Sequence, residues 1–157
     1  MKLNKTIPFV CIAIPLIVGG VSALLTRNSM MAFEQVPQPP LSPPEWLFPV
    51  VWTILYVLMG ISSYLILASN SSQEDRSSVL RLYAYQLLVN FLWPTFFFNF
   101  GWYLFAFLWL ILMWVLVFFM IRKFYELNRL AAYMNIPYLI WLTFAAYLNI
   151  GVWWLNR

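Results

Sequence analysis

The chain has 157 residues, a length typical of one domain, and hydrophobic residues make up 64% of it against 9% charged residues. This balance lies far outside the range of soluble proteins and predicts an all-α membrane protein. The net charge of +4 comes from basic residues that flank apolar runs and form no patch. We therefore expect no nucleic-acid partner.

Histidine is absent from the chain, and Cys11 is its only cysteine. This excludes disulfides, zinc sites, and Ser-His or Cys-His catalytic pairs. We expect no metal site, no catalytic residues and no cofactor, and we interpret Cys11 as a small buried side chain.

The first predicted span covers about residues 7–26, an apolar run that follows Lys2 and Lys5. Twenty helical residues rise roughly 30 Å, which is enough to cross the hydrocarbon core of a membrane. A cleaved signal peptide is the alternative, because Val21–Ala23 resembles a small-residue cleavage site. The run is long for a signal core, so we favour a retained span.

A long connection, residues 27–45, follows, and five prolines lie within Pro37–Pro44. Each proline fixes its own φ and biases the residue before it toward extended geometry, which predicts a stiff polyproline-like strut. A strut with unpaired carbonyls cannot lie in lipid and is expected at the membrane surface. It would be either a rigid linker or a lid over the bundle. The predicted lid residues are Pro40, Leu41, Pro43 and Pro44.

Four further spans are predicted, at about residues 46–69, 79–98, 102–121 and 130–156. The two middle spans come from Leu82–Ile121, forty residues without a charge, which is about twice the length of one crossing. Asn99–Trp102 is the only turn signal in this run, so a tight helical hairpin is expected there. The polar segments Ser69–Ser78 and Arg122–Arg129 are interpreted as connections. Residues 1–157 would then form a single five-transmembrane-helix bundle.

The distribution of basic residues predicts the orientation of this bundle. Five spans place the N-terminus and the second and fourth connections on one side, and that side holds seven basic residues, whereas the other holds Arg27 and Arg157. We expect a cytoplasmic N-terminus, and an external first loop and C-terminus, in a bacterial cell membrane. The seven basic residues are Lys2, Lys5, Arg76, Arg81, Arg122, Lys123 and Arg129.

No charged residue lies in the middle of a predicted span, which argues against an ion-coupled transporter and against paired-carboxylate catalysis. Aromatic and amide side chains recur there at helical spacing instead. An uncharged cavity with such walls would suit a flat, mostly apolar ligand. Alternatively, the asparagines only bond neighbouring helices and the rings only pack. The three helix faces are Trp52, Tyr56, Gly60 and Ser63; Asn90, Trp93 and Phe97; and Pro137, Trp141, Ala145 and Asn149.

Three segments carry a more specific pattern: LSPPEWLFPVVWTILYVLMGISSYLI at 41–66, NFLW at 90–93, and PYLIWLTFAAYLNIGVWWLN at 137–156. With five predicted spans in matching order, the chain resembles the translocator protein / tryptophan-rich sensory protein family, also called the peripheral-type benzodiazepine receptor family. The resemblance implies a five-helix bundle with a pocket beneath the first loop, often in homodimers. It also implies binding of porphyrins such as protoporphyrin IX and, in some members, of cholesterol and benzodiazepine-type ligands.

The resemblance also implies which residues face the ligand, and two positions depart from the family pattern. Leu41 stands where many relatives carry a tryptophan implicated in porphyrin chemistry, which weighs against light-dependent tetrapyrrole breakdown. The C-terminal sterol motif needs a base within five residues of its tyrosine, but the first base after Tyr147 is Arg157, so sterol recognition by that motif is not expected. The matching ligand-facing residues are Trp52, Asn90, Trp93, Trp141, Phe144, Ala145 and Asn149.

These features together predict an integral membrane tetrapyrrole-binding protein that acts as a sensor, scavenger or passive carrier. Without histidine, the site is expected to take metal-free porphyrin, or haem without His ligation. Two other classes stay open: an enzyme that degrades porphyrin with light and oxygen, and a ligand-free partner of another membrane protein.

Overall fold

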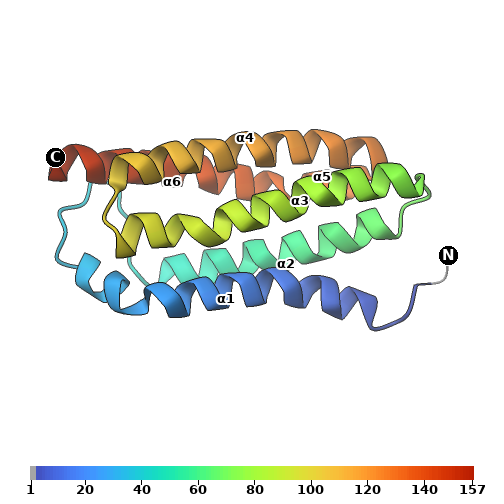
Figure 1. Cartoon of the computed structure of the whole chain (residues 1–157), viewed down its shortest axis with the longest axis horizontal. Helices are drawn as coiled ribbons and strands as arrows, with labels where there is room; N and C mark the ends of the chain where they lie inside the picture. Colours follow the sequence, from blue (N-terminus) through green and yellow to red (C-terminus); the bar gives the residue numbers. More distant parts are fainter. Residues whose placement is uncertain (1–2) are drawn as a thin grey trace.

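The computed structural model describes residues 3–157 and contains helices but no strand over that range. The long helices of this range run side by side along the long axis (Figure 1). Their bounds are α1 (Ile7–Phe33), α2 (Leu47–Leu67), α3 (Gln73–Pro94), α4 (Tyr103–Leu127) and α6 (Ile136–Asn156). A π-helix, η1 (Thr95–Asn99), extends α3, and a short helix, α5 (Arg129–Tyr133), precedes α6. Lys2, one of the basic residues behind the predicted orientation, lies outside the described residues.

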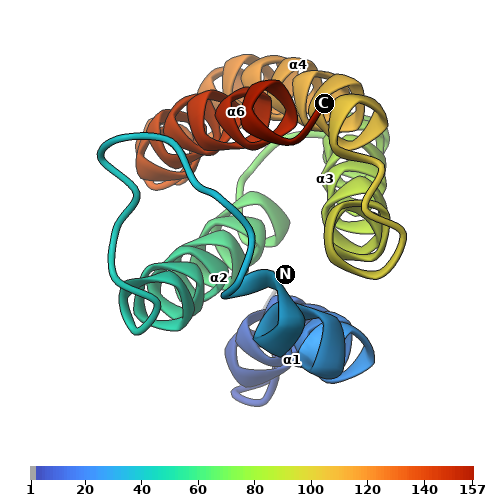
Figure 2. The same ribbon diagram turned by 90° about the vertical axis from the view of Figure 1, so that its left-hand side faces the viewer.

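The helices surround a common centre when the bundle is viewed from one end (Figure 2). Helix α1 packs on α2 and α3, α4 packs on α3 and α6, and α2 meets α5. Fully buried apolar side chains such as Met59, Val117 and Phe124 fill the half of the bundle remote from the first loop. The other half, next to residues 34–46, contains the cavity described below.

Four segments are long and apolar enough to cross a membrane: α1, α2, α4, and the segment Arg129–Asn156 that contains α5 and α6. Helix α3 is not among them, because it begins with charged residues and also carries Gln86 and Asn90. The predicted all-α bundle is confirmed, whereas a fifth membrane crossing stays a prediction.

Helix α1 runs one and a half to two turns further than predicted, to Phe33 instead of residue 26. The added segment contains two methionines and an alanine, which favour helix, and it contains no proline or glycine. Nothing in it therefore interrupts the backbone hydrogen bonds of the helix. This extension of α1 lies at the end of the bundle that carries the first loop.

Helix α3 begins at Gln73, and the prediction that Ser69–Ser78 is only a connection is wrong. The Ser72 hydroxyl accepts a hydrogen bond from the Asp75 amide at 3.0 Å, which is an N-cap, and acidic side chains in the first turn suit the helix dipole. The Arg76 guanidinium donates to the Ser69 carbonyl at 2.9 Å and so bonds a free carbonyl after α2.

One predicted boundary near the C-terminus is also wrong. Helix α4 continues through Arg122, Lys123 and Glu126, which are good helix formers, and ends at Leu127 instead of residue 121. The Asn128 side chain then caps α5 by accepting from the Ala131 amide at 3.1 Å. The predicted span 130–156 agrees with the segment Arg129–Asn156, which is divided into α5 and α6 at Met134–Asn135. Pro137 sits in the first turn of α6, where proline needs no partner for its missing N–H.

The predicted hairpin turn at Asn99–Trp102 is confirmed. Pro94 cannot donate to the helix ladder, and the chain widens there into the π-helix η1, closed by a bond from the Phe100 amide to the Thr95 carbonyl at 3.0 Å. Gly101 then adopts a φ of +65°, which glycine tolerates without strain, and α4 begins two residues later.

The first loop does not form the predicted polyproline strut. Leu41 has a φ of +68°, which breaks any extended run, and the Ser42 hydroxyl donates to the Pro39 carbonyl at 2.7 Å to close a turn. The loop is held against α6 instead: the Tyr147 hydroxyl donates to the Pro40 carbonyl at 2.7 Å, and the Asn156 amide donates to the Pro37 carbonyl at 3.1 Å.

Candidate ligand pocket

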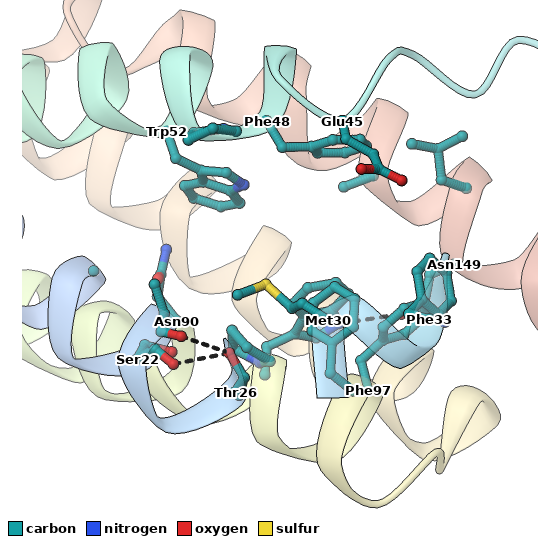
Figure 3. A pocket seen from close by; sticks show the side chains of 18 of the residues that line it. Ser22, Thr26, Met30, Phe33, Glu45, Phe48, Trp52, Asn90, Phe97 and Asn149 are labelled. Carbon is teal, nitrogen blue, oxygen red and sulfur yellow. Dashed lines mark hydrogen bonds between the residues drawn. The ribbon is translucent and has the colours of Figure 1, made fainter. Parts of the chain in front are cut away.

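A cavity of about 710 Å³ lies inside the loop end of the bundle, bordered by α1, α2, α3, η1, α4, α6 and the first loop. Figure 3 shows Trp52 and Asn90 at one end of it and Glu45, Phe33 and Asn149 at the other. Most of its border is apolar, and the charged residues on it lie toward the first loop.

Aromatic rings form the walls and hold one another in place. Trp52 stacks on Tyr56 with ring centroids 5.5 Å apart, and Trp93 stacks on Phe97 at 4.9 Å. Trp141 meets Phe48 edge to face at 5.8 Å, across the α2–α6 side of the cavity. Paired rings of this kind present large flat surfaces in fixed orientations.

Two asparagines border the cavity, and both also bond neighbouring helices. The Tyr56 hydroxyl donates to Asn90 Oδ1 at 2.7 Å, and Asn90 Nδ2 donates to the Tyr138 hydroxyl at 2.7 Å. At the other end, Trp93 Nε1 donates to Asn149 Oδ1 at 3.1 Å. Both asparagines therefore bond neighbouring helices, which was the alternative left open by the sequence, and both also border the cavity.

Most of the predicted site residues meet at this cavity. Phe144 does not border it; its ring packs against Trp141 at 5.6 Å and Tyr147 at 6.3 Å. The predicted site residues on the border are Trp52, Tyr56, Asn90, Trp93, Phe97, Trp141, Ala145 and Asn149.

Only one of the four predicted lid residues borders the cavity. Pro43 borders the cavity, but Pro40, Leu41 and Pro44 do not, and the Leu41 side chain is 82% exposed. The loop residues that do border the cavity are Glu34, Gln38, Pro39, Ser42, Pro43 and Glu45.

Helix α1 supplies a cavity wall that the sequence analysis missed. Ser22, Thr26, Met30 and Phe33 recur at helical spacing and all border the cavity, so periodicity was the available signal. The Ser22 hydroxyl donates to the Phe91 carbonyl on α3 at 3.0 Å, which holds this face of α1 against α3.

Three charged residues, Arg27, Glu34 and Glu45, lie on the border of the cavity near the first loop; we call them the charged rim. The pKa of the Glu45 carboxyl is raised, first by partial loss of surrounding water and then by the charge and hydrogen bond of Glu34. The deep part of the cavity, near Trp52 and Asn90, carries no charge.

Apolar helices of membrane-crossing length around an internal, ring-walled cavity define an all-helical integral membrane protein. More specifically, the chain belongs to the TspO/MBR family, whose model matches residues 11–155. The family resemblance seen in the sequence is thereby confirmed.

Relatives of very different origin share this similarity. The chain is 39% identical over 140 residues to Protein CrtK of Rhodobacter capsulatus, covering 88% of this chain and 85% of that protein. It is 31% identical over 147 residues to Tryptophan-rich protein TspO of Chlorobaculum tepidum, covering 93% of each. It is 36% identical over 129 residues to the Translocator protein of Ovis aries, covering 80% of this chain and 75% of that protein.

Proposed function

We propose that this protein crosses the membrane five times and binds a tetrapyrrole such as protoporphyrin IX in its cavity, as a sensor, scavenger or passive carrier. The observation that carries the proposal is the cavity itself, walled by stacked rings and uncharged in its depth. Its volume of about 710 Å³ falls within the roughly 300–1,000 Å³ typical of small-molecule pockets.

The distribution of charge favours one direction of binding. A porphyrin has a flat apolar ring and carboxylate side chains along one edge. The ring would lie among Trp52, Trp93 and Trp141, while the carboxylates would stay near Arg27 on the charged rim, where water reaches them. Because the chain lacks histidine, haem would bind without His ligation, and metal-free porphyrin is the preferred ligand.

Helix α3 supports the fifth crossing despite its lower hydropathy. Its polar residues Gln86 and Asn90 are buried inside the bundle, whereas Tyr85 and Leu88, which are more than half exposed, are the residues that would face lipid. Polar groups that point inward do not oppose a membrane position for the helix.

Titration of the purified full chain with protoporphyrin IX, followed by quenching of tryptophan fluorescence, tests the proposal. Each of Trp52→Ala, Trp93→Ala and Trp141→Ala should weaken binding by roughly fivefold, because one stacked ring contributes about 1 kcal/mol beyond its buried area. Trp114→Phe is the matched control: this ring packs outside the cavity and donates to Thr143. If the quenching curves of the wild type and of all three cavity variants have the same midpoint concentration of protoporphyrin IX, this pocket is not the binding site.

A further inference from the structure

A chain of buried hydrogen bonds leads from the cavity into the core, and all its donors point inward. The Tyr56 hydroxyl donates to Asn90 Oδ1, and Asn90 Nδ2 donates to the Tyr138 hydroxyl, both at 2.7 Å. The Tyr138 hydroxyl donates in turn to Gln86 Oε1 at 2.8 Å. Only Tyr56 and Asn90 border the cavity; Tyr138 and Gln86 are fully buried behind them.

The inner end of this chain sets its direction. Gln86 Nε2 faces the thioether sulfur of Met59 at 3.9 Å, and both side chains have no exposed surface. A thioether can only accept a hydrogen bond. If the Gln86 amide were turned round, its oxygen would face that sulfur, leaving two acceptors together without a proton. The Gln86 oxygen therefore faces Tyr138, whose hydroxyl lies 2.8 Å from it and 3.5 Å from the Met113 sulfur, its other near acceptor.

This direction determines what Tyr56 offers at the cavity. Its single hydroxyl proton is already donated to Asn90, so its oxygen has only lone pairs left for a ligand. Asn90 keeps one amide hydrogen and one lone pair and can meet either kind of group. Tyr56 is then the group that discriminates between ligands.

We propose that Gln86 and Tyr138 are positioning residues that make Tyr56 an acceptor, so that the cavity selects flat apolar ligands presenting an N–H or O–H donor to it. The inference rests on the proposed function only in that the cavity takes such a ligand, not in the ligand being a tetrapyrrole. A ligand with an acceptor at the same place would face the Tyr56 lone pairs and lose affinity.

Carbazole, dibenzofuran and fluorene test the inference, because these flat tricyclic molecules have nearly the same shape and differ at one position, which is N–H, O or CH₂. With the full chain in detergent, carbazole should bind roughly fivefold to tenfold more tightly than dibenzofuran, as expected for one neutral hydrogen bond against a mismatch. Equal affinities, or no binding of carbazole, would overturn the inference. Protoporphyrin IX titrated in the same preparation tests the proposed function separately.

Gln86→Leu and Tyr138→Phe should bring the carbazole-to-dibenzofuran ratio close to one while leaving fluorene affinity unchanged. A merely structural role would shift all three ligands together. Tyr83→Phe is the matched control, because Tyr83 is a buried tyrosine on α3 whose hydroxyl has no partner and does not border the cavity. A wild-type ratio retained in both Gln86→Leu and Tyr138→Phe would contradict the positioning role.

Discussion

Asn149 shows how a single residue serves both packing and the cavity. Its Oδ1 accepts from Trp93 Nε1, and its Nδ2 donates to the carbonyl of Tyr103 at 2.8 Å, so one amide ties α6 to α3 and α4. The bond to Trp93 also fixes the indole in its stack on Phe97. An amide that bonds across helices therefore also orients a cavity wall.

The charged rim brings two acidic side chains together at the cavity border. Glu45 and Glu34 come from different segments, and the pKa of the Glu45 carboxyl is raised first by partial loss of surrounding water and then by the nearby Glu34. An acid whose pKa is higher in the folded protein than in the unfolded chain stabilises the fold below the unfolded pKa, and this contribution is lost as pH rises through the folded pKa. Above that pH, the Glu45 carboxylate carries its negative charge at the cavity border.

Glu45→Gln should therefore flatten the pH dependence of stability over the pH range just above the ordinary pKa of a glutamate. In the wild type, the melting temperature should fall as pH rises through the raised pKa of Glu45, and the affinity for a carboxylate-bearing porphyrin should fall with it. Melting and titration curves in a pH series measure both. Glu126→Gln, which removes an exposed partner of Lys123, is the control. If melting temperature depends on pH with the same slope in the wild type, Glu45→Gln and Glu126→Gln, Glu45 is not the group responsible.

At the scale of elements, the packing of α1 on α2 depends on one glycine. A Cβ at Gly60 would meet the Cys11 carbonyl oxygen at 2.7 Å and backbone atoms of Ile12. Backbone atoms cannot move aside as a flexible side chain can, so the two helices must separate.

Gly60→Ala should lower the melting temperature of the detergent-solubilised protein substantially, because it pushes α1 away from the bundle. Gly20→Ala provides the comparison within the same pair of helices, since a Cβ there meets nothing within 4 Å and alanine favours helix. Equal melting temperatures for the two variants would show that α1 and α2 do not pack this closely.

The first loop depends on a similar contact with α6. A Cβ at Gly151 would lie 2.6 Å from the Pro39 ring, and Pro39 borders the cavity. The loop therefore sits directly on the helix surface, close to its bonds from Tyr147 and Asn156.

Gly151→Ala should lift the loop, which would speed proteolysis within residues 34–46 and speed release of bound porphyrin. Stopped-flow dissociation and limited proteolysis measure the two effects. Trp114→Phe, whose ring lies outside the cavity, serves as the control. If Gly151→Ala leaves both rates unchanged, the loop does not restrain the ligand.

At the scale of the whole molecule, the bundle exposes large apolar side chains on every outer helix. Phe9 and Leu24 on α1 and Ile140 on α6 are each at least 65% exposed. Such a surface requires lipid around it. The five-crossing arrangement then places residues 35 and 100 on one side of the membrane and residue 73 on the other.

Single cysteines test this arrangement in a Cys11→Ala background. Gln35→Cys and Phe100→Cys should react with a membrane-impermeant maleimide in intact cells, and Gln73→Cys only after permeabilisation, because the positive-inside rule places residue 73 in the cytoplasm. All three wild-type positions are exposed in the structure. Labelling of Phe100→Cys together with Gln73→Cys would mean that α3 does not cross the membrane, and a fully reversed pattern would overturn the orientation.

Prediction from the sequence succeeded where the signal is local. The hairpin turn at Asn99–Trp102 was predictable because glycine interrupts an otherwise continuous apolar run. The ring and amide faces were predictable because helical spacing places their members on one side of a helix. Phe144 does not border the cavity, because its ring packs against Trp141 and Tyr147, and its role as a ligand contact stays a prediction.

The amino-acid sequence alone determined an all-helical membrane protein with aromatic and amide faces, because hydropathy and periodicity belong to each segment by itself, and its motifs carried the resemblance to the family. Tertiary structure decided where the helices end, which residues of α1 reach the cavity, and how the loop turns at Leu41. It also joined Asn90 and Gln86 to Tyr138 across 48 and 52 residues of chain. Such bonds depend on how whole helices pack, and no local pattern records that packing.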